Sequence, residues 1–442
     1  MQTVLLYILG VLIMFVGIAL SIALHEVGHL VPAKKFGVRV GQYMIGFGPS
    51  VWSRKFGETE YGFKAIPMGG YISMAGMYPP AKPGGRARNS STGFFQTLVQ
   101  DARTASADTV EPGHEDRVFY KLAFWKRIII MLGGPFMNLL IGVVLYAIVL
   151  CVFGIAQPTT TIGGVSACVL PASSEQTECA STDEKAPAAA AGIKPGDRFV
   201  SIDGTSISSW DQATALIRDS PGEELSIVVE RDGSQLTLEA TPRLTERYVL
   251  DSTSTPVKND DGTTKTEKVG FLGIGTVYET QQQPITAVLP AVGDNIAHVG
   301  NLILHLPQRL IDVVNAAFGP DARDPNGPIS VVGVGRIAGE ITSLDTVPIA
   351  DKAAGLLQIL GSLNIALFVF NLIPLMPLDG GHVLGAIWEA VRRGVAKLFK
   401  RPDPGPVDIA KLIPLTFAVV IVLGAMSVLL IYADIVKPIS IL

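Results

Sequence analysis

Four long apolar runs separated by polar segments organise this chain of 442 residues. The runs are Val4 to Leu24, Ile128 to Phe153, Ala353 to Met376 and Leu412 to Ala433. Each supplies about the 20 apolar residues that a helix needs to cross a bilayer. The first run has no basic segment before it and no small-residue cleavage site after it, so we interpret it as a retained helix and not as a signal peptide. The pattern therefore predicts an α-helical membrane protein with four transmembrane helices.

The composition agrees with burial in a membrane. Hydrophobic residues make up 48% of the chain and charged residues only 17%, whereas soluble proteins average about 25% charged residues. The net charge of −4 argues against nucleic acid as a partner. Three cysteines are too few for a disulfide framework.

The distribution of charge predicts an orientation. Residues 30–127 contain 14 Lys and Arg against 7 Asp and Glu, and residues 377–411 contain 6 against 4. Residues 154–352 contain 14 against 26. The positive-inside rule then places the first two of these segments in the cytoplasm and the third outside.

The segment after the first span has a β pattern. Strand-like stretches run from Val38 to Met77 with a turn at Gly46-Phe47-Gly48-Pro49, and glycine alternates with aromatic residues around Gly69 and Gly70. An open edge of such a sheet could add an extended substrate as a further strand. A hairpin that only anchors the first span is an equally good interpretation. Residues 79–118 are rich in Pro, Gly, Ser and charge and predict a flexible loop.

The long acidic segment predicts a small α+β domain. The stretch Ala-Gly-Ile-Lys-Pro-Gly-Asp from Ala191, a helix over Ser209–Arg218, and strands over Glu224–Arg231 and Gln235–Ala240 resemble a bacterial PDZ domain. Such a domain can bind a peptide by strand addition, or act as a gate without a ligand. Before it, Cys168 and Cys179 lie in an extracytoplasmic insertion, and we hypothesise a disulfide between them.

The remainder of the acidic segment predicts a loop and one helix. Residues 244–268 are polar and predict the loop. Polar residues recur at steps of three and four from Asp294 to Asp312, which predicts one amphipathic helix at the membrane surface or against the bundle. His298 and His305 lie on that stripe, where a solvated face is a better interpretation than a metal pair.

The end of the first run carries the motif His-Glu-x-x-His, at His25, Glu26 and His29. On a helix both imidazoles project from one face and can reach one Zn²⁺. Glu26 then lies close enough to take a proton from zinc-activated water. Ionisable groups inside an apolar segment are costly and usually functional, so a chance match is the poorer interpretation.

The third run ends in a second polar motif. Pro374 and Pro377 cannot continue a regular helix, so the segment is expected to unwind before Asp379. Two histidines and one carboxylate would leave the fourth zinc position open, as in catalytic sites. His382 is the rival third ligand. In the second run, the polar side chain of Asn138 is expected to hydrogen bond to a neighbouring helix. This bond would either hold the helices together or form part of the site.

Together these motifs resemble the site-2 protease family. The resemblance rests on the His-Glu-x-x-His motif paired with Asn-Leu-Ile-Pro-Leu-Met-Pro-Leu-Asp-Gly from Asn371, and it covers nearly the whole chain. A single PDZ domain looks most like the actinobacterial members. The matching motifs in between are Gly46–Pro49, Pro67–Tyr71, Gly134–Asn138 and Gly327–Gly333.

The resemblance implies an intramembrane zinc metalloprotease. His25, His29 and Asp379 would bind zinc, Glu26 would be the catalytic base, and Asn371 would help to hold unwound substrate. The substrates would be single-span membrane proteins such as anti-sigma factors, cut within the membrane after another protease has acted. Two other classes stay open at this point, a non-proteolytic membrane-anchored PDZ receptor and a zinc-containing transporter, although a transporter would normally show internal repeats.

These interpretations divide the chain into eight segments. They are 1–35, the first helix; 36–78, a membrane-associated β-sheet; 79–124, a cytoplasmic loop; 125–154, the second helix; 157–243, the PDZ-like domain; 244–350, a linker with the amphipathic helix; 353–382, the third helix; and 409–436, the fourth. The cofactor expected is Zn²⁺, and the partners expected are membrane lipid, membrane-protein substrates and a PDZ ligand.

Overall fold

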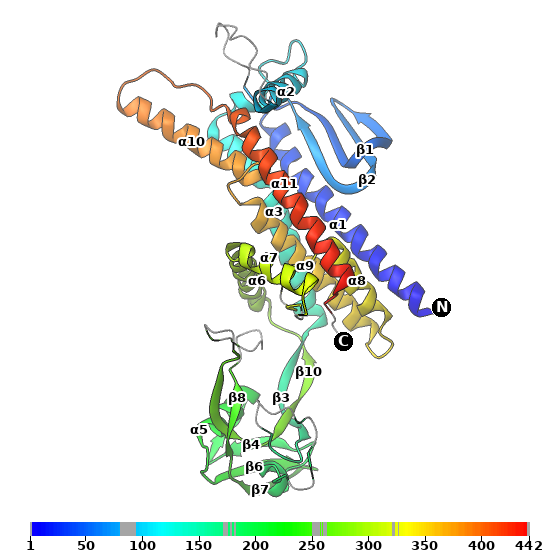
Figure 1. Ribbon diagram of the computed structural model, residues 1–442, viewed down its shortest axis with the longest axis vertical. Coiled ribbons are helices and arrows are strands. Elements are labelled where there is room, and N and C mark those ends of the chain that lie inside the picture. Colours follow the sequence, from blue (N-terminus) through cyan, green and yellow to red (C-terminus); the bar gives the residue numbers. More distant parts are fainter. Residues whose placement is uncertain are drawn as a thin grey trace. The chain divides into compact units, whose positions relative to one another are not determined.

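In the computed structural model the chain forms two compact units, Met1–Phe153 with Pro284–Leu442, and Gly154–Gln283 (Figure 1). The structure describes residues 2–79, 94–170, 176, 179–180, 183–249, 257, 259, 263–320, 323–325 and 327–439.

The first unit is mainly helical. Among the described residues, five helical segments are long and apolar enough to cross a membrane, by length and composition. The four at the predicted runs are α1 (Gln2–Lys35), α3 (Phe124–Ile148) with a π-helical turn Val149–Phe153, α9 (Ile349–Asn371), and α11 (Ile413–Val436) after a 3₁₀ turn Ile409–Leu412. The fifth is Ile285–Leu304, which contains α6 (Val288–Leu304).

The predicted amphipathic helix from Asp294 to Asp312 is in fact two helices. It breaks at His305 between α6 and α7 (Leu306–Phe318). Pro307 lies in the first turn of α7 and has no backbone N–H to continue the hydrogen bonds of α6. Asn295 of α6 donates to Ser362 Oγ of α9 at 3.3 Å, so α6 lies against the bundle.

Small residues let the helices of this unit approach closely. A β-carbon added to Gly28 of α1 would lie 2.2 Å from the carbonyl oxygen of Gly133 in α3. At the other end of α1, a β-carbon on Gly10 would lie 2.4 Å from the Ala338 carbonyl oxygen of α8 (Val331–Ser343). Such backbone contacts are typical of helix packing in membranes.

The β segment of the first unit consists of two long strands, β1 (Val40–Phe56) and β2 (Thr59–Met74). Residues 40–45 of β1 pair on one side with 70–74 of β2 and on the other with 60–63, and 52–56 pair with 59–63. Two strands therefore build four rows, with residues 70–74 along one edge. The two central rows, 40–45 and 60–63, run parallel, and each outer row runs antiparallel to its neighbour. The predicted turn at Gly46–Pro49 is a bend inside β1, made by Gly46 (φ +93°) and Gly48 (φ +88°), because such φ values favour glycine.

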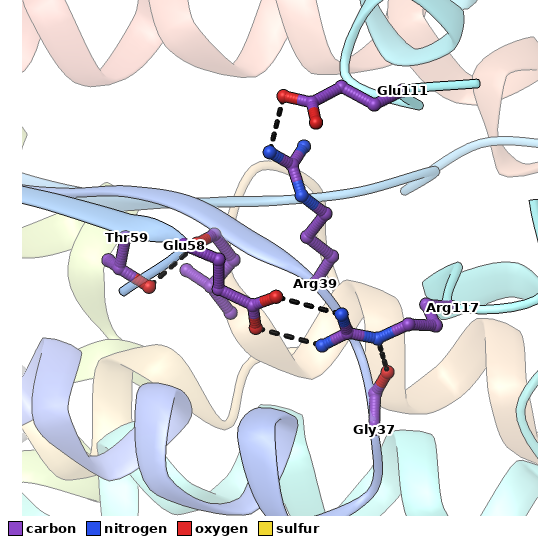
Figure 2. Close-up of polar contacts among 7 residues, drawn as sticks. Gly37, Arg39, Glu58, Thr59, Glu111 and Arg117 are labelled. Carbon is purple, nitrogen blue, oxygen red and sulfur yellow. Dashed lines mark hydrogen bonds and ion pairs between the residues drawn. The ribbon is translucent and has the colours of Figure 1, made fainter. Parts of the chain in front are cut away.

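Polar contacts hold the turn between β1 and β2 in place (Figure 2). Arg117 donates through both terminal nitrogens to the Glu58 carboxylate at 2.8 Å, and through Nε to the Gly37 carbonyl at 3.0 Å. Arg39 pairs with Glu111 in the same region. The Arg117 hydrogen bonds lower the pKa of Glu58, so the pair is charged at neutral pH.

The segment predicted as a flexible loop contains a helix, α2 (Phe94–Asp108). Its polar sequence gave no apolar run, but one face meets α11, and Arg103 pairs with Asp408. Residues 80–93 of the predicted loop lie outside the described residues. A 3₁₀ turn, Phe119–Lys121, leads into α3.

The second unit is an α+β domain. Its main sheet has the order β10-β3-β4-β6-β7, with β5 beside β4, and a second hairpin joins β8 and β9. The strands are β3 (Ile155–Val165), β4 (Arg198–Ile202), β5 (Thr205–Ser206), β6 (Leu225–Arg231), β7 (Ser234–Ala240), β8 (Arg243–Tyr248), β9 (Thr266–Phe271) and β10 (Ile274–Gln281), and the helices are α4 (Pro187–Ala190) and α5 (Trp210–Asp219).

The second unit contains most of the local features predicted from its sequence. The helix after Ser209 and the paired strands β6 and β7 are confirmed, and Ser209 caps α5 by accepting from the Gln212 N–H at 3.2 Å. The Cys168–Cys179 disulfide is confirmed. The loop predicted over 244–268 is wrong in part, because its two ends pair as β8 and β9; residues 250–256, 258 and 260–262 lie outside the described residues.

Candidate metal centre

Three polar side chains from two distant parts of the chain meet inside the helical unit. His25 Nε2 lies 3.1 Å from His29 Nε2, and Asp379 Oδ2 lies 3.4 Å from each of these nitrogens. The two histidines follow one another on one face of α1, four residues apart, as the motif predicted. Among the described residues, they and Asp379 form the one group of His, Cys, Asp or Glu side chains arranged to hold a metal ion.

The spacing of the three donor atoms fits Zn²⁺. A tetrahedron with donors about 2.1 Å from its centre has edges of about 3.4 Å, close to the observed triangle. Asp379 Oδ2 is buried and accepts no hydrogen bond from any residue that the structure describes. Two imidazole nitrogens and one carboxylate oxygen form the donor set of a catalytic zinc site, with one position left for substrate or water.

Two residues of helix α3 contact the imidazole rings of His25 and His29 and orient them. The Nδ1 of His29 lies 2.7 Å from the Ile130 carbonyl oxygen, which can only accept, so Nδ1 carries the proton and the Nε2 lone pair faces Asp379. Nδ2 of the buried Asn138 lies 3.1 Å from Nδ1 of His25, and Asn138 Oδ1 is buried without a hydrogen-bond partner in the described part of the chain. Turning this amide over would place Oδ1 at Nδ1, where it could accept from the Nδ1–H and fix the same tautomer in His25.

Gly134 makes room for the two histidines. A β-carbon on this residue would lie 2.2 Å from Nε2 of His29 and 2.7 Å from Nε2 of His25. Glycine is common in membrane helices, so a glycine alone in the second run does not indicate a role at the site. The available signal was the position of Gly134, one helical turn before Asn138.

The chain segment that leads from α9 to Asp379 is tightly packed. Helix α9 ends at Asn371, and α10 (Asp379–Leu398) begins at Asp379, with both prolines of the predicted unwinding in between. A β-carbon on Gly380 would lie 2.4 Å from the Ile373 carbonyl oxygen, and one on Gly381 would lie 2.7 Å from the Met376 nitrogen. These contacts hold the first turn of α10 against the connecting segment.

The rival ligand, His382, lies on the buried side of α10. Its ring meets the ring of Phe119 edge to face, with centroids 6.5 Å apart. It does not belong to the group of converging donors. His298 and His305 do not belong to it either.

The remaining predicted site residues are Gly69, Gly70 and Asn371. The edge row of β2 passes beside the motif, because a β-carbon on Gly70 would lie 3.1 Å from Cγ of Glu26. Gly69 (φ +100°) faces the Phe47 ring, which stacks with Tyr71. Asn371 donates from Nδ2 to the Leu367 carbonyl of its own helix at 2.9 Å.

Comparison with known proteins agrees with the paired motifs. Residues 13–401 match Peptidase family M50. The chain is 33% identical to zinc metalloprotease Rip1 of Mycobacterium tuberculosis, covering 98% of this chain and 99% of that protein. It is 33% identical to zinc metalloprotease Rip1 of Mycolicibacterium smegmatis, covering 98% of both, and 27% identical to metalloprotease MmpA of Caulobacter vibrioides, covering 87% and 88%. The chain therefore belongs to the site-2 protease family, peptidase family M50, and is a zinc metalloprotease of the actinobacterial Rip-like kind.

Proposed function

We propose that this membrane protein cleaves peptide bonds within the transmembrane segments of single-span membrane proteins. In this proposal His25, His29 and Asp379 hold the zinc ion, and Glu26 is the general base. The observation that carries it is the triangle of donor atoms, with edges of 3.1, 3.4 and 3.4 Å, formed where two apolar helical segments end.

The chemistry follows from the residues around that triangle. When bound, the zinc ion supplies a Lewis acid that polarises the peptide carbonyl and lowers the pKa of water to about 7. Glu26 accepts the proton of the attacking water and returns it to the leaving amine nitrogen. Ile130 and Asn138 keep the Nε2 lone pairs of the two histidines directed at the ion.

Substrate binding is proposed to use the edge of the sheet beside Glu26. A helical substrate has its peptide bonds hydrogen bonded and shielded, so it has to unwind before it can be cut. The edge row of β2, residues 70–74, pairs on one side with β1 and runs past Glu26 on the helix. Gly69 and Gly70 let an extended backbone approach this edge closely, and Asn371 is proposed to bind the freed backbone from the other side.

The second unit is proposed to be a PDZ-like domain that binds a peptide terminus. It has a groove of ≈ 380 Å³ lined by α5, β8 and β9, with Ile217 and Phe271 on its apolar wall and Arg247 beside them. The guanidinium of Arg247 stacks 3.4 Å above the Phe271 ring. The lining also includes Arg218, which pairs with Glu267, so apolar walls beside the Arg247 guanidinium suit an apolar residue next to a carboxylate.

Anti-sigma factors cut first by another protease are the proposed substrates. The charge distribution supports a cell (inner) membrane location with the metal centre toward the cytoplasm and the second unit outside.

Cleavage of a tagged single-span protein by the purified full-length chain in proteoliposomes tests this function. The expected result is one cut inside the transmembrane segment, lost with a zinc chelator and restored by Zn²⁺. A chain that binds the tagged protein in the second unit and never cuts it, with zinc bound, would instead support a membrane-anchored PDZ receptor.

A further inference from the structure

Helix α10 presents a continuous apolar stripe that no other described element covers. Leu384, Trp388, Val391 and Val395 are each between 48% and 56% exposed, and Leu398 is 77% exposed. They are spaced three or four residues apart, so they lie on one face of the helix. Single exposed apolar residues are ordinary on a protein surface, but a stripe along a whole helix indicates a partner.

The opposite face of α10 is packed against the ends of the membrane-spanning helices. Glu389 is buried and pairs with Arg127, at the start of α3, at 2.7 Å. Its other oxygen accepts from the Val407 N–H at 3.0 Å, just before the 3₁₀ turn that leads into α11. A β-carbon on Gly385 would lie 2.7 Å from Ile409.

These contacts place α10 at a boundary of the membrane. It starts after the short proline-containing segment that follows α9, and it packs where α3 and α11 begin, so three apolar spans terminate beside it. In Figure 1, α10 runs out to the side of α11 and not along it. A helix in this place, with one protein-facing side and one free apolar side, has its free side at the level where lipid tails meet headgroups.

The far end of α10 is strongly basic. Arg392, Arg393 and Lys397 lie in its last two turns, and Lys400 and Arg401 follow the helix. Arg393 pairs with Glu389 and Asp403 at 3.2 and 3.3 Å. Lys397, Lys400 and Arg401 are exposed and form no ion pair with any residue in the described part of the chain.

We propose that α10 is an interfacial helix that binds anionic lipid. The apolar stripe lies among the outer acyl carbons, with Trp388 at the interface, and the basic end binds phosphate headgroups. Charge selects this occupant, because unpaired cations beside an apolar stripe match an anionic leaflet, and each adds about 1 kcal/mol to binding at such a surface. A second copy of the chain would bring the same cations against one another.

This contact also bears on the metal centre, and that part rests on the proposed function. Asp379 is the first residue of α10, and Gly380 and Gly381 fix its first turn against the segment after α9. Anchoring the far end of α10 in lipid would hold the Asp379 carboxylate at its distance from His25 and His29.

The test is quenching of Trp388 by brominated lipids in the reconstituted full-length chain. Trp52, Trp125 and Trp210 are replaced by Phe, so that Trp388 alone reports. We expect brominated phosphatidylglycerol to quench Trp388 at about a threefold lower mole fraction than brominated phosphatidylcholine. The variant Lys397→Gln with Lys400→Gln should lose most of this preference and keep the quenching. Lys185→Gln with Lys268→Gln, which removes the same charge from the second unit, should change neither.

Three results would contradict the proposal. Equal quenching by both lipids in the parent chain would refute anionic selectivity. A Trp388 reached by aqueous acrylamide but by neither lipid would put the helix in water, and one shielded from all three quenchers would mean that a protein covers it. If the triple Trp variant fails to fold, a nitroxide on Val395→Cys in a Cys151→Ser chain gives the same depth measurement. None of these readouts depends on proteolysis, so they can fail while the proposed function holds.

Discussion

Gly134 lies against His29 so closely that a β-carbon on the glycine would be 2.2 Å from the imidazole Nε2. Any side chain at 134 has to displace this nitrogen, and a shift of about 1 Å at a reacting centre can cost about 100-fold in rate. We expect Gly134→Ala to lower cleavage by about that factor and to weaken zinc retention in dialysis. Gly300→Ala in α6, where nothing lies within 4 Å, is the matched control and should behave like the parent. Normal zinc retention in Gly134→Ala would contradict the packing described here.

Replacing Glu26 by Gln separates proton transfer from metal binding. The amide keeps the size of the side chain but cannot accept the proton, so cleavage should fall by roughly 1,000-fold. Zinc content by mass spectrometry of the intact chain should stay at the parent value. Loss of zinc together with activity would make Glu26 a structural or ligating residue instead.

Asp379 and His382 compete for the place of third ligand. The proposed function uses Asp379, because its Oδ2 lies 3.4 Å from both Nε2 atoms while His382 packs against Phe119. Asp379→Asn should release zinc at a lower chelator concentration than the parent, and His382→Gln should keep it. The reverse order of zinc loss would move the ligand to His382.

Asn138 is expected to act through His25. Outer partners of metal-binding histidines typically contribute 10- to 100-fold in metal affinity, so Asn138→Leu should weaken zinc binding by about 10-fold or more. Asn138→Asp still offers an oxygen to Nδ1 and should retain most of the affinity. Competition with a chromogenic chelator measures both, and equal losses in the two variants would point to helix packing instead.

The Glu58–Arg117 pair predicts how acid affects the sheet. Arg117 holds the pKa of Glu58 below its ordinary value, so the pair stabilises the fold above the ordinary carboxyl range and loses this effect as the pH falls through the lowered value. Both side chains are partly exposed, so the effect is expected to be about 1 kcal/mol or less. Glu58→Gln should therefore lower the thermal midpoint at pH 7 by about one degree, and the difference from the parent should shrink at pH 3. Glu279→Gln is the control, and a difference independent of pH would refute the role of the charge.

The sequence predicted the elements whose signal is local. The two motifs indicated the three donors, because histidines four apart share a helix face and a proline pair ends a helix wherever it stands. The helix over Ser209–Arg218 and the two strands that pair as β6 and β7 were equally readable.

Other features depend on distant contacts and have no local signal. Helix α2 is polar and its partner Asp408 lies 305 residues further on than Arg103, so no window of sequence could show the pairing. Residues 60–63 of β2 pair with two different parts of β1, because β1 bends at two glycines. In the sequence these glycines look like an ordinary turn between two strands. The role of Gly134 becomes visible only when α1 and α3 are brought together.

The separation of the donors along the chain also bears on how a new molecule becomes active. Two of them are made near the start, at positions 25 and 29, and the third stands 350 residues beyond His29. During synthesis the early pair enters the bilayer long before Asp379 leaves the ribosome. On the proposed function, a partly synthesised chain therefore lacks the third zinc ligand and cannot cleave neighbouring membrane proteins until Asp379 has been added.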